Sequence, residues 1–288
     1  MAYKTILVLC DSSEAAASRI ELARHLAERH GSHLIGLHIR PPFEMPVFRG
    51  AGFAGAAHYR AYEERTGAGL ERSRQTFERI ATGKTSGRRG PTTEWLVARG
   101  VVGGFATMEA LAQARCADLV VLSQPGPDRP ADGIPADLPE AVALWSGRPT
   151  LVVPYVGKPA LPLETVIVCW KASREAARAA ADALPILRQA SKVIVLTVDA
   201  HPASGVGDRD PAADAAAWLA RQDVKATIRH EVAADGDVGQ KILSCAADIG
   251  ADLIVVGAYG RSRMRELALG GVTRTMFRSM TVPVLMAH

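Results

Sequence analysis

Short apolar runs alternate with longer amphipathic segments along most of the chain. In the second half the short runs are rich in β-branched and aliphatic residues, which is typical of strands; they are residues 165–170, 192–198, 226–233, 252–258 and 282–287. The segments between them repeat Ala, Leu and Ile with helical spacing; they are residues 173–190, 211–222 and 238–250. Near-continuous apolar strands separated by helices predict a parallel sheet that is covered by helices on both faces.

The chain also repeats itself. The sequence ADLVVLSQPG at 117–126 matches ADLIVVGAYG at 251–260, and the opening KTILVLCDSSEAA matches ETVIVCWKASREAA. This repeat predicts two domains, at residues 1–155 and 163–288, each a doubly wound α/β unit with about five parallel strands. The Pro- and Gly-containing stretch YVGKPALP between them is typical of a domain boundary.

The first half carries a long insertion at residues 41–90, where the second half has only a short connection. Pro and Gly argue against regular structure at its start, whereas residues 58–81 have a helical pattern. Long connections are either mobile segments or binding lids, and the sequence leaves both interpretations open.

Glycines follow the fourth strand of the second half in a pattern that indicates a ligand site. Ligands of open α/β sheets bind beyond the carboxyl ends of the strands, and Gly257 stands at such an end. The N–H groups at a helix start attract phosphate, and a helical pattern begins directly after the last two glycines. The predicted contacts are Gly257 and Gly260 along one side of a nucleotide, and Gly270, Gly271, Val272 and Thr273 around its phosphates. The competing interpretation is that these glycines only turn the chain.

These residues resemble a known family. GAYGRSRMRELALGG is similar to the G-x2-G-x9-G nucleotide loop of universal stress proteins, and ILVLCDSSEAA resembles their first strand with its adenine-contacting aspartate. Two such units resemble the tandem members of that family. The resemblance implies an adenine-nucleotide α-hydrolase-like fold with a pseudo-twofold repeat, ATP with Mg²⁺ as ligand, and pairing of the halves through their last strands. It also implies that Val198 packs on the adenine.

Each half departs from the family pattern. The first half keeps Asp11, but its loop has Ser123, Gly126 and Ala136 at the aligned positions. Carboxylates would repel phosphate there, so we expect no ATP in this half; they are Asp128, Asp132 and Asp137. The second half keeps the loop, with Gly271 where Ser or Thr is usual and Lys171 in place of the aspartate. An ammonium cannot accept a hydrogen bond from the adenine amino group, so Lys171 either contacts a phosphate or points into solvent.

Composition narrows the function further. The net charge is +4 with dispersed basic residues, which makes nucleic-acid binding an unlikely role. No apolar run approaches the length of a membrane helix, and no signal peptide precedes the first strand, so a cytoplasmic protein is expected. No P-loop, GxSxG motif or metal-ligand spacing is present. We therefore expect no catalytic residues, no metal site and, at most, slow incidental ATP hydrolysis.

Two functions follow as hypotheses. The first is a regulatory module that binds ATP or a related phosphate ligand and signals its presence to unidentified protein partners. A role in stress adaptation is implied only by the family resemblance. The alternative is a nucleotide-independent interaction scaffold in which both sites have degenerated. Whether two chains also form a homodimer, beyond the pairing of the halves within one chain, is left open by the sequence.

Overall fold

The computed structural model describes residues 2–43, 54–83, 90–99, 105–124, 126, 135–198, 210–233, 236–258 and 271–288. The strands in these ranges are β1 (Thr5–Cys10), β2 (His33–Arg40), β3 (Thr92–Arg99), β4 (Leu119–Ser123), β5 (Thr150–Val153), β6 (Thr165–Cys169), β7 (Lys192–Val198), β8 (Ala226–Glu231), β9 (Leu253–Gly257) and β10 (Val284–Ala287). The helices are α1 (Ala15–His30), α2 (Ala54–Ala81), α3 (Phe105–Ala114), α4 (Leu138–Trp145), α5 (Arg174–Leu187), α6 (Pro211–Ala220), α7 (Val238–Ile249) and α8 (Gly271–Ser279).

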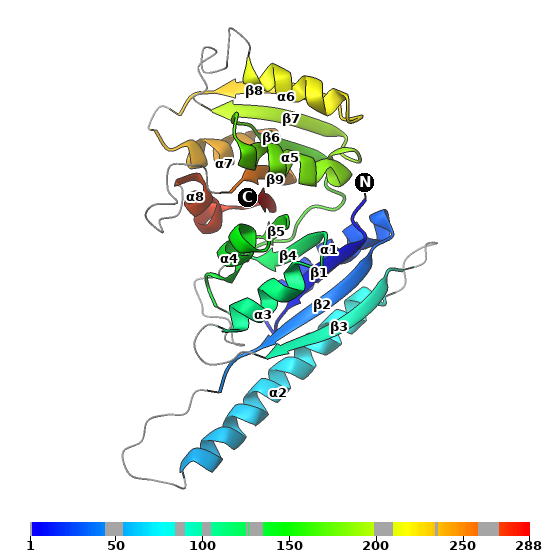
Figure 1. The fold of residues 1–288 in the computed structure, drawn as a ribbon, viewed down its shortest axis with the longest axis vertical. Coiled ribbons are helices and arrows are strands. Elements are labelled where there is room, and N and C mark those ends of the chain that lie inside the picture. Colours follow the sequence, from blue (N-terminus) through cyan, green and yellow to red (C-terminus); the bar gives the residue numbers. More distant parts are fainter. Residues whose placement is uncertain are drawn as a thin grey trace.

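The strands form one ten-stranded sheet in the order β3-β2-β1-β4-β5-β10-β9-β6-β7-β8 (Figure 1). Strands pair in parallel within β1–β5 and within β6–β10, and the two sets meet where β5 and β10 pair antiparallel. The predicted pair of doubly wound, five-stranded parallel units is confirmed, and the pairing through the last strands occurs within the chain.

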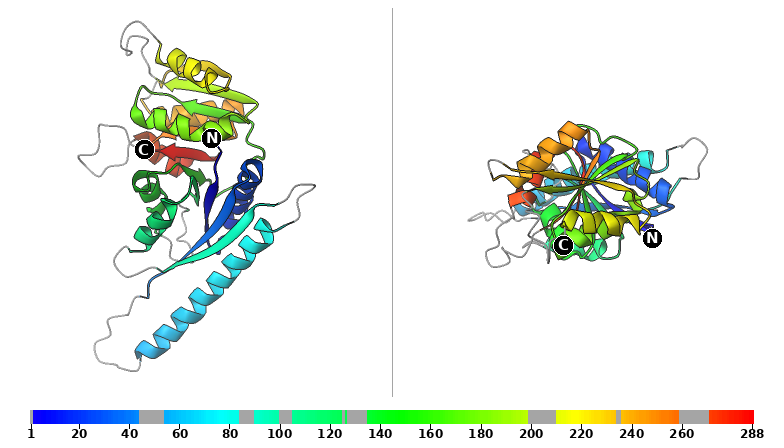
Figure 2. Two further views of the ribbon diagram at one scale, coloured as in Figure 1. Left: turned by 45° about the vertical axis from the view of Figure 1, so that its right-hand side comes forward. Right: turned by 90° about the horizontal axis from the view of Figure 1, so that it is seen from above.

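Helices cover both faces of the sheet (Figure 2). The largest core cluster joins buried side chains of α1, α2, α5 and α6 to one face and runs through both halves. Two smaller clusters lie on the other face, one under α3 and α4 and the other mainly under α7 and α8. Because consecutive side chains of a strand point to opposite faces, strands buried on both sides must have apolar interiors, as β1, β4 and β9 do.

The helix predicted in the insertion is α2, which is 28 residues long, whereas its counterpart α6 has ten. Its last turns are anchored in the core by Phe77 and Ile80. Residues 56–61 near its start are exposed, and this end of the helix projects beyond the sheet (Figure 1). Residues 44–53 and 84–89 of the insertion lie outside the described residues.

Side-chain contacts reinforce the joint between the halves. Leu151 of β5 lies opposite Leu285 of β10, and both are fully buried. Tyr3, before β1, donates a hydrogen bond to the carbonyl oxygen of Asp182 on α5 at 2.7 Å. On the other face, the Gln124 amide donates to the carbonyl oxygen of Phe277 on α8 at 2.9 Å.

His30 of α1 lies at this joint rather than in solvent, and His25 is partly buried on the same helix. His30 packs edge-on against the Tyr3 ring, with 5.2 Å between ring centroids, and its Nδ1 contacts Gln189 of the second half at 3.2 Å. The Nε2 atoms of His25 and His30 are buried and have no hydrogen-bond partner. Burial, followed by the charge of Arg29, lowers the pKa of His30 from 6.5 to about 4 and also lowers the pKa of His25.

We predict that acid weakens the folded state through His30. Between pH 6.5 and 4 the unfolded chain binds a proton on His30 that the native chain excludes, so the free energy of unfolding should fall as the pH decreases through this window. Urea unfolding of His30→Gln across the window should show a shallower pH dependence than the wild type, with His58→Gln on the exposed start of α2 as the control. Equal slopes for His30→Gln and the wild type would contradict this assignment.

Candidate functional site

The predicted site residues that the structure describes lie at the carboxyl ends of the second-half strands and at the start of α8. Lys171 follows β6 and is exposed, and Val198 is the last residue of β7. Gly257 ends β9, and Gly271 is the first residue of α8. Gly260 and Gly270 lie outside the described residues.

The first turn of α8 places the remaining predicted residues. Gly271 is exposed and Thr273 is buried. Val272 packs against the core cluster beneath α7 and α8, and Val198 packs against the same cluster. The end of β7 and the start of α8 therefore both pack against the core on the same face of the sheet. The N–H groups of a first helical turn have no partner within the helix and carry the positive end of its dipole.

Gly257 has a packing role that sequence reasoning missed. A Cβ built on Gly257 would lie 2.6 Å from the backbone nitrogen of Ala176 and 2.6 Å from the backbone carbonyl carbon of Glu175. The missing side chain thus lets the first turn of α5 approach the end of β9. The pattern alone gave no signal for this contact, because the two elements are about eighty residues apart in the chain. A ligand contact at Gly257 stays a prediction.

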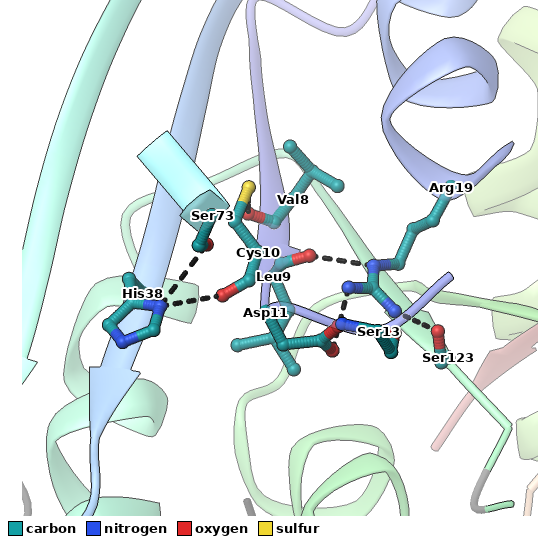
Figure 3. Close-up of polar contacts among 9 residues, drawn as sticks. All are labelled: Val8, Leu9, Cys10, Asp11, Ser13, Arg19, His38, Ser73 and Ser123. Atoms are coloured by element: carbon teal, nitrogen blue, oxygen red, sulfur yellow. Dashed lines mark hydrogen bonds and ion pairs between the residues drawn. The ribbon is translucent and has the colours of Figure 1, made fainter. Parts of the chain in front are cut away.

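The matching edge of the first half is closed by buried polar groups (Figure 3). Arg19 of α1 is fully buried, and its Nε donates to the Leu9 carbonyl oxygen at 2.6 Å. Its Nη2 donates to Asp11 Oδ2 at 2.8 Å, and its Nη1 donates to the Ser123 hydroxyl. The other Asp11 oxygen accepts from the backbone N–H of Ser13 at 2.9 Å and from the Ser13 hydroxyl.

This network occupies the aspartate that the resemblance assigns to adenine. Asp11 is only 7% exposed. Burial raises the pKa of its carboxyl, but the Arg19 guanidinium and the Ser13 hydrogen bonds together lower it below the ordinary value. The carboxylate is therefore ionised and turned toward protein donors. Further along, Ala136 and Asp137 are exposed just before α4, whereas Asp128 and Asp132 lie outside the described residues.

The second half has no equivalent of this network. The repeat aligns its three charged or polar members with residues of different chemistry: Asp11 with Lys171, Arg19 with Ala179, and Ser123 with Gly257. The aligned pairs occupy the same places in the fold, after the first strand, in the helix that follows and at the end of the fourth strand. The described part of the second-half edge is thus not closed by a fully buried ion pair, because the Arg174 guanidinium that pairs with Glu175 there is 60% exposed.

A different polar group lies at the second-half edge. Glu175, in the first turn of α5, is 2% exposed, and its Oε1 accepts from the Arg174 Nε at 2.5 Å. Its Oε2 is buried without a hydrogen-bond partner. Burial raises the pKa of Glu175, but the hydrogen bonds from Arg174, from its own backbone and from Ser173 together lower it below the ordinary value, so the carboxyl is ionised. Trp170, after β6, also has a buried ring nitrogen without a partner.

The side chains of Thr197, His230 and Asp210 contact one another in a row next to this edge. The Thr197 hydroxyl contacts His230 Nδ1 at 2.7 Å, and His230 Nε2 lies 3.2 Å from Asp210 Oδ2. Such a series can activate a nucleophile, but Thr197 is only 2% exposed, and Asp210 also caps α6 by accepting from the Ala212 N–H. This geometry is structural, since a substrate could not reach the hydroxyl.

No group of three or more His, Cys, Asp and Glu side chains among the described residues is arranged to hold a metal ion. None of the described helices combines the length and the apolar character needed to cross a membrane.

The fold and its strand edge define a tandem doubly wound α/β protein. A model of the universal stress protein family matches the chain twice, at residues 2–154 and 162–288. The chain therefore belongs to the universal stress protein family, as a tandem member. A search of curated protein sequences finds no match.

Solved structures share the whole fold at low sequence identity. A universal stress protein from Archaeoglobus fulgidus DSM 4304 is 15% identical with a TM-score of 0.67, and the alignment covers 98% of this chain and 97% of that one. A functionally unknown protein from Pseudomonas aeruginosa PAO1 is 17% identical with a TM-score of 0.56, covering 99% and 92%. At this identity the likeness concerns the fold alone.

The packing at Gly257 generates a stability prediction. Gly257→Ala forces the start of α5 away from β9, and overpacking of this kind costs about 1–3 kcal/mol. Urea unfolding should show this loss, while Gly271→Ala, whose Cβ enters open space, should retain wild-type stability or gain slightly. An unchanged unfolding midpoint for Gly257→Ala would show that α5 is not held by this contact.

Proposed function

We propose that this protein is a cytoplasmic regulatory member of the stress response that binds ATP or a related phosphate ligand through its second half. The ligand lies at the carboxyl ends of β6, β7 and β9, with its phosphates at the first turn of α8. The chain carries out no dedicated chemistry on it, and Mg²⁺ enters with the nucleotide. Protein partners recognise the ligand-bound chain through surfaces outside this edge.

The difference between the two edges carries the proposal. The first half turns its aspartate inward and fills the edge with the Arg19 side chain. The second half has Ala179 and Gly257 at the aligned positions. The first-half edge is closed by its own buried ion pair, whereas the second-half edge is not. We therefore infer that each chain binds one ligand, in its second half.

The start of α8 supports the placement of phosphate. Gly271 is exposed, and among the described residues outside its own helical turn no atom lies within 4 Å of the place where a Cβ would lie, which leaves room for a phosphate to approach the backbone. Val198 and Val272 are partly buried against the apolar core on this face of the sheet, and apolar side chains of this kind suit the flat face of a base or sugar.

Lys171 gives the site its expected selectivity. Its exposed ammonium can attract phosphate but cannot accept a hydrogen bond from an adenine amino group. We therefore expect the phosphate part to contribute more to affinity than the identity of the base. In the alternative function, a nucleotide-independent scaffold, the apolar side chains at the start of α8 would serve only packing.

Gly271→Asp is the direct test. The substitution places a carboxylate at the start of α8, where it suits the helix dipole but repels phosphate. Calorimetric titration with Mg-ATP should give close to one ligand for each wild-type chain and an affinity lowered roughly tenfold or more in the variant, while thermal stability stays equal or rises slightly.

Gly90→Asp is the matched control, because it adds the same charge at another exposed glycine with open space around it and should leave ATP affinity unchanged. Equal ATP affinities of Gly271→Asp and the wild type would show that phosphate does not bind at the start of α8. Absence of any binding to nucleotide-free wild-type protein would favour the scaffold function.

A further inference from the structure

Strand β8 is the last strand at one edge of the ten-stranded sheet, and its ladder partner within the described residues is β7. Figure 1 shows β8 at one end of the molecule, away from the joint of the halves. The N–H and C=O groups along the outer side of such a strand are a template for pairing with a strand of another chain.

The side chains of β8 distinguish this edge from the rest of the second half. Among the described residues of that half, the exposed large apolar side chains are Ile228, at 40%, and Val232, at 73%. Val232 directly follows β8, and an extended chain continued to it places both side chains on one face. Arg229 and Glu231 lie on the other face and carry opposite charges.

This order of residues is self-complementary in antiparallel pairing. When two β8 strands pair about a twofold axis at His230, Ile228 faces the partner's Val232. On the other face, Arg229 lies opposite the partner's Glu231. Apolar pairs and opposite charges at facing positions stabilise antiparallel strands, whereas like charges at facing positions destabilise them. Each of these contacts occurs twice, because a twofold interface uses the same surface of both copies.

One register alone gives this match. An axis shifted by one residue, to Arg229, would place Ile228 opposite the partner's His230 and Thr227 opposite the partner's Glu231, so both kinds of favourable pair would be lost. With the axis at His230, the imidazole does not obstruct the partner. Its Nδ1 lies 2.7 Å from the hydroxyl of Thr197 on β7, so the ring is directed toward its own sheet.

We propose that the outer edge of β8 binds a second copy of this chain, so that two ten-stranded sheets join through antiparallel β8 strands. The other candidate for pairing with a second copy, the last strand of each half, is already used within the chain, where β5 pairs with β10. A twofold contact is complete with two copies, so the assembly is a dimer. This inference concerns assembly and holds whether or not the second half binds a nucleotide.

Two charge-reversed variants provide the test, because each should pair poorly with itself and well with the other. In Arg229→Glu two carboxylates face each other across the axis, and in Glu231→Arg two guanidinium groups do. Each variant alone should therefore dimerise roughly tenfold or more weakly than the wild type. In an equimolar mixture every carboxylate faces a guanidinium again, so the mixed dimer should form more tightly than either variant pairs with itself. Sedimentation velocity over a range of protein concentrations measures these associations.

A second variant tests the apolar contact. Ile228→Glu places a carboxylate opposite the partner's Val232 and should be monomeric at concentrations where the wild type is a dimer. Val97→Glu is the matched control, because Val97 is exposed to the same extent, 41%, but lies on β3 at the opposite edge of the sheet. This control should dimerise as the wild type does.

The wild-type measurement does not depend on any variant folding. A wild-type chain that stays monomeric at every concentration would overturn the proposal. A mass that grows beyond two copies would also overturn it, because the contact would then be open-ended, as when β8 pairs with β3 of the next copy. If the mixed variants pair no better than each variant alone, Arg229 does not face the partner's Glu231 and the twofold axis at His230 is wrong.

Discussion

The antiparallel pairing of β5 with β10 is the contact on which the rest of the structure depends. Each of these strands would otherwise be a short apolar edge, and exposed edges of that kind invite pairing with other chains. Their union makes one continuous sheet, aligns α1 with α5 on the same face, and lets one core cluster run through both halves. Neither half can then move independently without breaking ladder hydrogen bonds and the contacts of Tyr3 and Gln124.

Within this symmetric frame the two strand edges have diverged in chemistry. In the first half an ion pair between Arg19 and Asp11 is buried where the repeat would place a ligand. Burying two charges costs several kcal/mol for each ion, and the additional hydrogen bonds to Leu9 and Ser123 offset that cost. In the second half the ion pair at the edge joins Glu175 to Arg174, whose side chain is 60% exposed. The first-half edge is thus closed by a buried ion pair, whereas the described part of the second-half edge is not.

Much of the fold could be predicted because its signals are local. The apolar runs of β6, β7 and β9 and the repeat itself predict the two parallel sheets, and the family resemblance implies the joint through the last strands. The site was predicted less completely, because its decisive contacts join distant segments. In the sequence, Arg19 looks like an ordinary polar residue on the surface of a helix. Only the structure shows that it is buried and contacts Ser123, which is more than a hundred residues away in the chain. The glycine pattern marks Gly257 as the end of a strand, but it gives no sign that Gly257 contacts the start of α5. Glu175 gave no signal, since an acidic residue is common in a first helical turn.

Of the two similar edges, we propose that only the second-half edge binds the ligand. Hydrogen–deuterium exchange of the intact chain, with and without saturating Mg-ATP, distinguishes the two edges. We expect slower exchange in the presence of Mg-ATP for peptides covering the start of α8 and the ends of β6 and β7. Peptides covering the ends of β1 and β4 should exchange at the same rate in both samples. Protection at the first-half edge, or equal protection of both edges, would show that the ligand does not bind at the second-half edge alone.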